Sequence, residues 1–405
     1  MSKLKVLMLG WEFPPYKSGG LGTACHDLTK GLARQDVKVT FVMPFAPEGA
    51  KARFVKLIGT SNLPNNVKIK SINSPLTAYM TSSSYEQHIN SASGKSKKAI
   101  YGKDLFIEVQ RYTAIAAHIA KEEEHDLIHA HDWMTYQAAI ETKKHTKKPL
   151  FVHLHATEFD RTGGNPDPRI AHIEYTGLKA ADKIITNSEF SKQNILTHYK
   201  LPASKIDVVH WGIDTDSIPL REEKADEKLI LFLGRITLQK GPDYFIETAK
   251  KVLDYEPNAH FAIVGDGDML PKIITRAAEL GIADKITFTG ALSGEAVHRA
   301  FQKAKLYVMP SVSEPFGLVA LESIKNGTPV LLSKQSGVSE VVTHALKADF
   351  WDINDMTEKI VAVLRHDALH EELTKNSTKE AKKFTLDEPA RKVIESYHSV
   401  LKRNH

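Results

Sequence analysis

One stretch, Leu306–Val342, constrains the fold of this chain more than any other. Its apolar run Leu306–Met309 predicts a buried strand, and Val330–Leu332 predicts the next one. Between these strands apolar residues recur at helical spacing, and Gly327 and Pro329 are placed to end the helix. A strand–helix–strand unit of this size indicates a parallel sheet, whose ligands bind at the carboxyl ends of the strands.

Two glutamates flank the helix of this unit. We expect Pro315 in the first helical turn, with Glu314 in the loop before it. Glu322 follows about two turns further on, at roughly 1.5 Å of rise per residue. Two such carboxylates could hold two parts of one polyol ligand, such as a sugar and a ribose. An acidic turn stabilised by the helix dipole, together with an ordinary surface glutamate, is the alternative explanation.

The size and composition of the chain favour a two-domain globular protein. Its 405 residues exceed one average core. The net charge is only +5, and no long basic run is interleaved with aromatic residues, so we do not expect nucleic-acid binding. The single cysteine, Cys25, excludes an internal disulfide. No apolar run suits a signal peptide or a membrane span, so we expect a cytoplasmic location and no transmembrane segment.

The first half alternates strands and helices, as doubly wound domains do. Its strands are predicted from apolar runs at Leu4–Leu9, Lys38–Met43, Leu127–Ala130, Leu150–Leu154, Lys183–Thr186 and Ile206–Val209.

A glycine-rich turn lies between the first strand and the first helix of this half. Gly19 and Gly20 let backbone amides approach a ligand closely, and a helix N-terminus favours an anion. Lys17 adds a positive charge there, which suits an incoming phosphate or carboxylate. A flexible loop with a solvated lysine is the alternative explanation.

Two histidine pairs raise the question of a metal site. His129 and His131 point to one face of a strand, and so do His153 and His155. Imidazoles at strand ends commonly bind backbone groups, and no further set of His, Asp or Glu stands at a recognised metal spacing. We therefore expect no metal.

The strand–helix pattern restarts after a charged connection, His210–Lys228. The second half begins with predicted strands at Leu229–Leu233, Phe261–Val264 and Ile286–Phe288.

Two cations follow the first strand of the second half. Arg235 lies just after its end, and Lys240 lies just before a helix that starts with proline. Two permanent cations beside a positive helix end repel each other unless an anion lies between them. A diphosphate would supply that anion. Two solvated surface cations are the alternative explanation.

Together these motifs resemble the family 4 glycosyltransferases of the GT-B fold, over nearly the whole length of the chain. The paired-glutamate segment Glu314–Glu322 carries the resemblance, with Gly234-Arg235 and Lys240-Gly241. Within the family the chain is most similar to glycogen and starch synthases, through Lys17–Gly22 and His131–Trp133.

The resemblance implies a fold of class α/β with two doubly wound, Rossmann-like parallel-sheet domains that face a central cleft. Residues 1–212 would form the acceptor-side domain, and residues 213–385 would form the nucleotide-sugar-binding domain. Residues 386–405 would form a helix that packs back on the first domain.

The resemblance also implies a role for each matching residue. The catalytic residues would be His155, Arg235, Lys240 and Glu314. Donor binding would fall to Gly19, Gly20, Phe316, Gly317, Leu318, Val319 and Glu322. Acceptor binding would fall to Lys17, Asp132 and Trp133.

The implied activity is that of a retaining, metal-independent hexosyltransferase with no cofactor. It would transfer a hexose, glucose being the first choice, from UDP- or ADP-glucose to a glycan such as an α-1,4-glucan. Another cell-surface or small-molecule acceptor and a GT-B-fold sugar-nucleotide epimerase are the alternatives. A hydrolase with a histidine metal site and a non-catalytic sugar-nucleotide sensor also stay open. The segment His210–Asp214 departs from the family's usual pattern, and this leaves the acceptor open.

Overall fold

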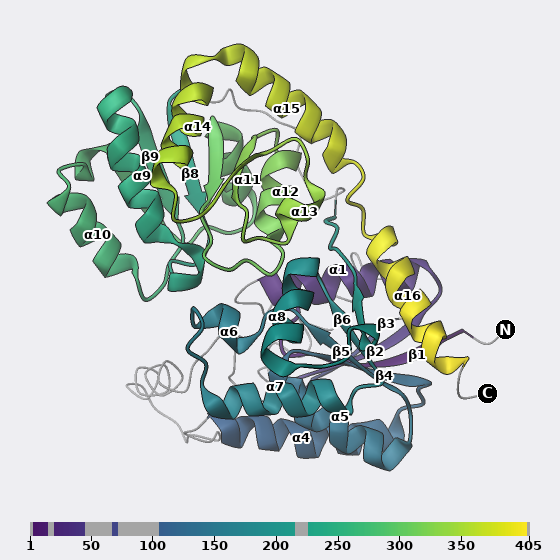
Figure 1. Cartoon of the computed structure of the whole chain (residues 1–405). Coiled ribbons are helices and arrows are strands. Elements are labelled where there is room, and N and C mark those ends of the chain that lie inside the picture. Colours follow the sequence, from purple (N-terminus) through teal and green to yellow (C-terminus); the bar gives the residue numbers. More distant parts are fainter. Residues whose placement is uncertain (1–2, 15–19, 45–66, 72–104, 215–225, 403–405) are drawn as a thin grey trace.

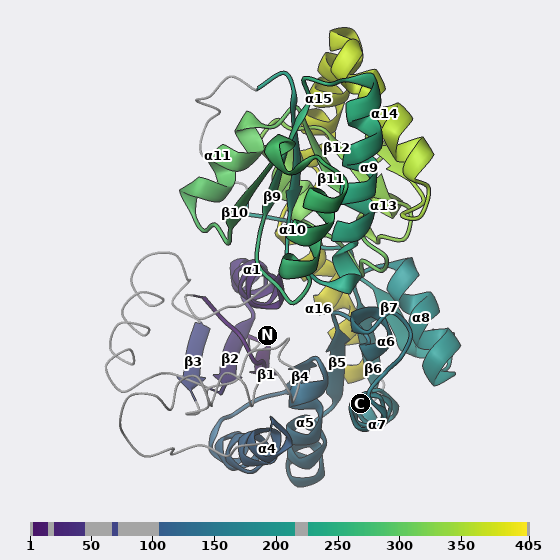
Figure 2. The same cartoon turned by 90° about the vertical axis from the view of Figure 1, so that its left-hand side faces the viewer.

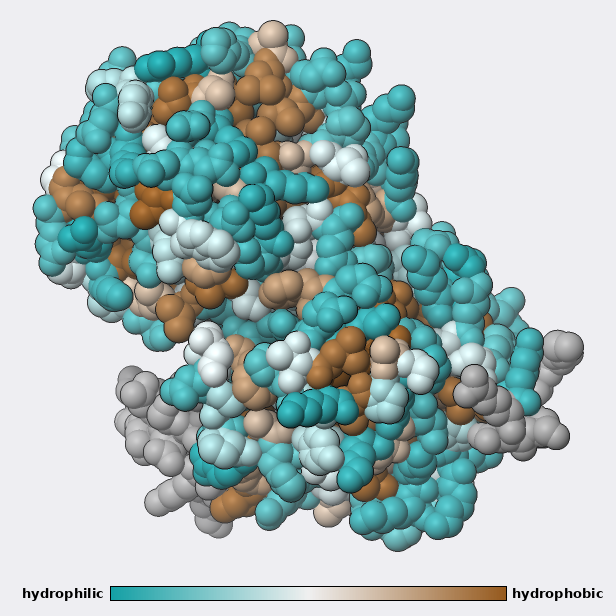
Figure 3. Space-filling view, viewed as in Figure 1, coloured by the Kyte–Doolittle hydropathy of each residue, from teal (hydrophilic) through white to brown (hydrophobic). Residues whose placement is uncertain are grey.

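The computed structural model describes residues 3–14, 20–44, 67–71, 105–214 and 226–402. Lys17 and Gly19, two predicted ligand contacts, lie outside these ranges. The described residues form two α/β units, one above the other in Figure 1, each with a parallel sheet between helices. The face seen in Figure 3 is mainly hydrophilic, with apolar residues in separate small patches. None of the helices described is long and apolar enough to cross a membrane.

The sheet of the first unit has seven strands among the described residues, in the order β3-β2-β1-β4-β5-β6-β7, all parallel. The strands are β1 Lys5–Leu9, β2 Lys38–Met43, β3 Val67–Ser71, β4 Leu127–His131, β5 Leu150–Leu154, β6 Lys183–Thr186 and β7 Ile206–Val208. The direction of winding reverses between β1 and β4, and ligands of such sheets bind at that switch point. Figure 2 shows β3, β2 and β1 side by side in the lower unit.

The sheet of the second unit repeats this arrangement with six parallel strands in the described residues, in the order β10-β9-β8-β11-β12-β13. The strands are β8 Leu229–Leu233, β9 His260–Val264, β10 Ile286–Gly290, β11 Leu306–Met309, β12 Val330–Ser333 and β13 Leu346–Ala348. Its switch point lies between β8 and β11. The expected fold, two Rossmann-like sheets in GT-B order, is confirmed.

Helices cover both faces of each sheet (Figure 1). In the first unit they are α1 Gly20–Arg34, α4 Leu105–Glu122, α5 Trp133–Thr146, α6 Glu158–Arg161, α7 Pro168–Ala180 and α8 Glu189–Tyr199. In the second unit they are α9 Pro242–Tyr255, α10 Leu270–Glu279, α11 Glu295–Lys303, α12 Leu318–Lys325, α13 Val338–Val341, α14 Ile353–Arg365 and α15 Asp367–Ala381.

The last helix, α16 (Asp387–Leu401), leaves the second unit and lies beside α1 on the first (Figure 1). Gly31 permits this close approach, since a Cβ there would lie 2.6 Å from the Leu386 carbonyl oxygen. On the sheet side Tyr397 packs edge-on against Phe151, at 4.9 Å between ring centroids. The chain therefore crosses between the two units twice, first after β7 and again before α16.

Most strand predictions agree with the structure. Five are confirmed residue for residue, namely Lys38–Met43, Leu150–Leu154, Lys183–Thr186, Leu229–Leu233 and Leu306–Met309. The others differ by one or two residues at their ends, and the predictions missed β3 and β13.

The expected start of the helix after β11 is wrong. Pro315 does not lie in its first turn, because α12 begins only at Leu318. Gly317 precedes the helix with φ = 107°, a backbone conformation that residues with a side chain rarely adopt. Pro315 instead lies in the loop, where its carbonyl oxygen accepts a hydrogen bond from Ser188 Oγ at 2.6 Å.

Candidate functional site

A cavity of about 240 Å³ lies between the carboxyl edges of the two sheets. The first unit contributes the start of α1 and the residues that follow β5 and β6. The second unit contributes the loops after β8 and β11 and the start of α12. Both switch points therefore face one space, where side chains from distant parts of the sequence meet.

The cavity brings together nine of the residues that were singled out from the sequence. They are Gly20, His155, Arg235, Lys240, Glu314, Phe316, Gly317, Leu318 and Val319. Asp132, Trp133 and Glu322 do not line it.

Lys240 and Glu314 form an ion pair in the wall of the cavity. Ser311 Oγ donates a further hydrogen bond to Glu314 Oε2 at 3.2 Å. Gly241, with φ = 64°, allows the turn that carries Lys240 to lie against the end of β11, because a Cβ there would lie 2.1 Å from the Pro310 carbonyl oxygen. A glycine thus sets the distance between the lysine and the glutamate.

Arg235 has a local partner as well. Its Nη2 donates to Gln239 Oε1 at 3.2 Å, and the side chain is half-buried. Each of the two cations thus has a hydrogen-bonding partner in this structure, and the expectation that a diphosphate lies between them stays a prediction. No pattern in the sequence indicated the contact of Arg235 with Gln239 or the ion pair of Glu314 with Lys240.

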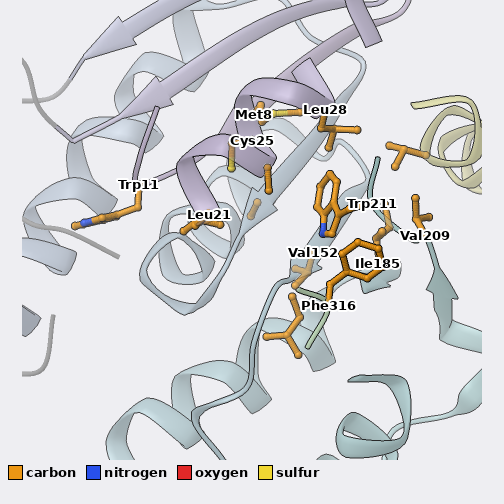
Figure 4. Close-up of a cluster of buried hydrophobic side chains, with 14 of the residues drawn as sticks. Met8, Trp11, Leu21, Cys25, Leu28, Val152, Ile185, Val209, Trp211 and Phe316 are labelled. Carbon is orange, nitrogen blue, oxygen red and sulfur yellow. The ribbon is translucent and has the colours of Figure 1, made fainter. Parts of the chain in front are cut away.

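The start of α12 forms the floor of the cavity. Phe316 is 3% exposed and lies in the apolar cluster around Trp211 and Val152 of the first unit, as Figure 4 shows. The amides of Leu318 and Val319 lie in the first turn, where a helix leaves N–H groups without an intrahelical acceptor. Apolar packing of Phe316 therefore holds the N-terminus of α12, with these N–H groups, at the cavity.

Glu322 lies one turn into α12, half-buried and outside the lining of the cavity. It is close to Tyr307, which does line the cavity. Burial raises the pKa of Tyr307, and the charges of Glu314 and Glu322 raise it further.

On the opposite side of the cavity, His155 is tied to three neighbours. Its backbone N–H donates to Asp132 Oδ1 at 2.8 Å, and its backbone carbonyl oxygen accepts from Asn187 Nδ2 at 3.1 Å. Its Nε2 lies 2.8 Å from His131 Nδ1. Trp211 packs almost parallel to the imidazole, at 5.4 Å between centroids.

The two histidine pairs form one buried cluster, whereas the sequence analysis considered them as two separate pairs. Strands β4 and β5 are neighbours with His131 opposite His153, so all four imidazoles share a face of the sheet. Burial lowers the pKa of His129, His153 and His155, and it lowers the pKa of His131 to about 3. The four rings are therefore neutral at physiological pH.

Donor atoms that could hold a metal ion lie within 4.8 Å of one another in two groups. One group is Cys25 with His131 and His155, and the other is His129 with His131 and His153. Nitrogen and sulfur are zinc ligands. Here, however, His129 and His153 stack within 5° of parallel, and His131 is hydrogen-bonded to His155. Lone pairs of stacked rings do not converge on one point. Independence from metal stays a prediction.

A buried charged network supports this side of the cavity from below. Arg161 Nη1 donates to Glu174 at 2.8 Å, and its Nη2 donates to the Ala156 carbonyl at 2.7 Å. Burial raises the pKa of Glu174 to about 7 and that of Asp132 to about 6, while Arg161 opposes both shifts. Glu158 is a further acid beside the guanidinium. Three carboxylates thus share one cation.

Asp132 and Trp133 are buried below the cavity, at 1% and 2% exposure. Asp132 holds the backbone of His155, and the Trp133 ring lies 6.0 Å from the Phe106 ring. Their acceptor-binding role stays a prediction.

Direct contacts also tie the two units together beside the cavity. Glu340 of α13 accepts hydrogen bonds from the N–H groups of Glu189 and Phe190 at the start of α8, at 2.9 and 2.6 Å. Ser313 Oγ donates to Asp160 Oδ1 at 2.6 Å. The sequence predictions missed these contacts, because they join loops more than a hundred residues apart.

Two protein families match this chain, one for each unit. The family described as Glycosyltransferase Family 4 matches residues 18–217. The family described as Glycosyl transferases group 1 matches residues 215–380.

Three relatives match over most of the chain. An uncharacterised glycosyltransferase of Methanocaldococcus jannaschii is 29% identical, over 97% of this chain and 98% of its own. D-inositol 3-phosphate glycosyltransferase of Mycolicibacterium smegmatis is 29% identical over 67% of each chain. Glycogen synthase of Mycobacterium tuberculosis is 25% identical, over 84% of this chain and 80% of its own.

A solved structure has the same arrangement of the two units. Sucrose-phosphate synthase from Thermosynechococcus elongatus superposes with a TM-score of 0.76, over 99% of this chain and 100% of its own. The sequence identity is 19%, so this likeness concerns the fold.

Proposed function

Because the chain belongs to the family 4 glycosyltransferases of the GT-B fold, we propose that it transfers a hexose from a nucleoside diphosphate sugar to a hydroxyl group, with retention of configuration. One observation carries the proposal. The cavity between the two sheets gathers Arg235, Lys240, Glu314 and the first turn of α12 opposite His155. Two cations and an open helix end form a site for a diphosphate, and the carboxylate and the imidazole suit sugar hydroxyls.

In the proposed reaction, the positive charges of this site would stabilise the leaving group. A nucleoside diphosphate gains negative charge as the glycosidic bond breaks. Arg235 and Lys240 both line the cavity, where their charges would stabilise it. In this proposal the two side chains do the work of a metal ion, and no cofactor takes part.

The proposed transfer occurs on one face of the sugar. The leaving phosphate oxygen takes the proton of the acceptor hydroxyl, and the acceptor attacks from the same side. A covalent route would need Glu314 as a nucleophile. The hydrogen bond that Ser311 donates to that carboxylate lowers its nucleophilicity, which favours the direct route.

Each residue that was predicted to bind the sugar-nucleotide donor has a role in this proposal. Glu314 and the amides from Phe316 to Val319 would hold the sugar, and Glu322 would reach the ribose hydroxyls. Gly20, the first residue of α1, lines the cavity, where it would approach the phosphate or the sugar.

A glucan is the first candidate acceptor, since glycogen synthase of Mycobacterium tuberculosis aligns over 84% of this chain. A phosphorylated polyol is the second candidate. The observation that favours it is the higher identity, 29%, to the D-inositol 3-phosphate glycosyltransferase of Mycolicibacterium smegmatis.

A donor and acceptor panel tests the proposal. The protein is incubated with UDP-, ADP- and GDP-hexoses, each with glycogen, with inositol 3-phosphate or with neither, and release of the nucleoside diphosphate is measured. We expect release from one donor to rise on addition of one acceptor, with the sugar recovered on that acceptor in the retained configuration.

Other results would contradict it. Release that no acceptor stimulates would indicate a hydrolase, and sensitivity to chelators would contradict metal independence. A donor that is bound but never consumed would indicate a sensor, and conversion to an isomeric sugar nucleotide would indicate an epimerase.

A further inference from the structure

Hydrogen bonds within the first unit hold three of the four polar atoms of His155. Asp132 accepts from its backbone N–H, Asn187 donates to its backbone carbonyl oxygen, and His131 is hydrogen-bonded to its ring Nε2. The remaining polar atom is Nδ1, on a side chain that lines the cavity. What the ring offers to a ligand therefore depends on whether Nδ1 carries the proton.

The ring also has little freedom to turn. His153 packs against it at 4.5 Å between centroids and 14° between planes, and Trp211 packs at 5.4 Å and 11°. His155 is 6% exposed. A ring flip would break the bond to His131 and disturb both stacked neighbours, so the orientation of the imidazole is fixed.

The position of the proton follows from the other end of the His131 ring. His131 Nε2 is buried without a hydrogen-bond partner among the described residues. A proton on that nitrogen would be an orphaned buried donor, and such N–H groups are rarer in folded proteins than unsatisfied acceptors. The proton of His131 therefore lies on Nδ1 and is donated to His155 Nε2.

His155 then has its own proton on Nδ1. Its ring is neutral, because burial lowers its pKa, and a neutral imidazole whose Nε2 accepts must have its hydrogen on the other nitrogen. The chain of donors runs from His131 through His155 to the cavity.

We infer that His131 is a positioning residue, which fixes His155 as the Nδ1–H tautomer so that the ring donates a hydrogen bond to an oxygen of the bound ligand. His131 does not line the cavity and would act only through His155. The use of this donor on a hydroxyl or phosphate oxygen of a nucleotide sugar rests on the proposed function, whereas the tautomer itself does not.

Three substitutions of His131 separate positioning from packing. In His131→Asn the carboxamide nitrogen can take the place of Nδ1 and still donate to His155. In His131→Gln the carboxamide reaches towards the place of Nε2 instead, and His131→Leu has no donor. We expect His131→Asn to keep kcat within about fivefold, and the other two to lower it about 10- to 10²-fold with little change in KM.

The tautomer can be read directly from the unmodified protein. Long-range ¹H–¹⁵N correlation spectra of protein labelled with ¹⁵N-histidine distinguish an Nδ1–H ring from an Nε2–H ring, and the signals of His155 are identified by their loss in His155→Asn. We expect Nδ1–H at His155 in the parent and in His131→Asn. This readout needs no substrate, so it stands or falls separately from the proposed function.

Two results would overturn the inference. The first is an Nε2–H tautomer, or exchange between both tautomers, at His155 of the parent. The second is equal activity of the folded Asn, Gln and Leu variants, which would reduce His131 to a packing residue.

Discussion

The two walls of the cavity are built in different ways. On the side of the first unit, neutral histidines and a buried charged network are hydrogen-bonded to one another, and nearly every member is buried. On the side of the second unit, Arg235 and Lys240 are half-buried cations that contact Gln239 and Glu314, respectively. The first wall is a rigid support, whereas the second holds charge ready for an anion. Removing the cation of the charged network in the first wall should therefore cost stability, and removing the cations of the second wall should cost activity.

The largest effect is expected at the centre of the first wall. Arg161→Met leaves Glu174, Glu158 and Asp132 without their shared cation, and removing one partner from a buried charged network costs about 3–5 kcal/mol. Chemical denaturation measures this loss. The matched control is Arg391→Met, whose ion pairs with Glu388 and Glu395 lie on the surface, so its loss should change the free energy of unfolding far less. Equal losses in the two variants would contradict the contrast between the walls.

The second wall should show the reverse pattern. Arg235→Ala and Lys240→Ala are each expected to lower turnover at least about 10²-fold while the protein stays folded, because each removes a charge that would stabilise the leaving diphosphate in the proposed reaction. Steady-state kinetics with the donor identified by the panel measures this. Lys250→Ala is the control. Lys250 lies in α9, the helix that begins just after Lys240, but it pairs with the exposed Asp254. Near-normal turnover of a folded Lys240→Ala protein would remove the diphosphate assignment.

Because of Glu174, the stability that the first wall contributes should depend on pH. Its folded pKa is about 7 against an ordinary value of 4.5, so the folded state binds this proton more tightly than the unfolded state does. Its contribution to stability is present below pH 4.5 and is lost as pH rises through about 7. Between pH 5 and pH 8 the parent should therefore lose about 2 kcal/mol relative to Glu174→Gln in urea unfolding. Parallel pH profiles of parent and variant would contradict this.

Glu322 tests how far the second wall extends beyond the cavity lining. If it binds the ribose, Glu322→Ala should weaken nucleoside diphosphate binding about tenfold, as expected for a lost hydrogen bond to a charged group. Calorimetric titration measures the affinity. Glu279→Ala removes an exposed carboxylate that pairs with Arg276 and should leave the affinity unchanged. An unchanged affinity in Glu322→Ala would exclude the ribose role.

The smallest effect concerns the partner of Lys240. Glu314 competes with a phosphate for the ammonium group, so Glu314→Gln should tighten binding of free nucleoside diphosphate roughly fivefold, or about 1 kcal/mol, while turnover falls. The same titration checks this. Weaker binding in the variant would show that Glu314 supports the diphosphate rather than competes with it.

The sequence predicted the scaffold better than it predicted the interactions in the site. Continuous apolar runs such as Leu150–Leu154 identified strands that are buried on both faces, so their limits agree with the structure. The short strand β13 was missed, because Leu346 and Lys347 are only half-buried and carry no clear apolar pattern. Pro315 was misplaced because the left-handed backbone at Gly317 delays the start of α12. Local patterns report burial, but they do not report such turns.

The site itself was recognised through motifs, and its contacts depend on distant pairings. That His131 meets His155 follows from β4 pairing with β5, a pairing that the two repeated His-x-His patterns could have suggested. The bonds from Glu340 to the start of α8 join residues about 150 positions apart, and no local signal in the sequence indicates them.

A structure of the protein with a nucleoside diphosphate bound is the most direct measurement. We expect the two phosphates in the cavity between the sheets, with the terminal one in hydrogen-bonding reach of the Arg235 guanidinium and the Lys240 ammonium group. Lys240 would then have turned from Glu314 towards the phosphate. A nucleotide bound elsewhere on the protein, with the ion pair of Lys240 and Glu314 undisturbed, would contradict the account.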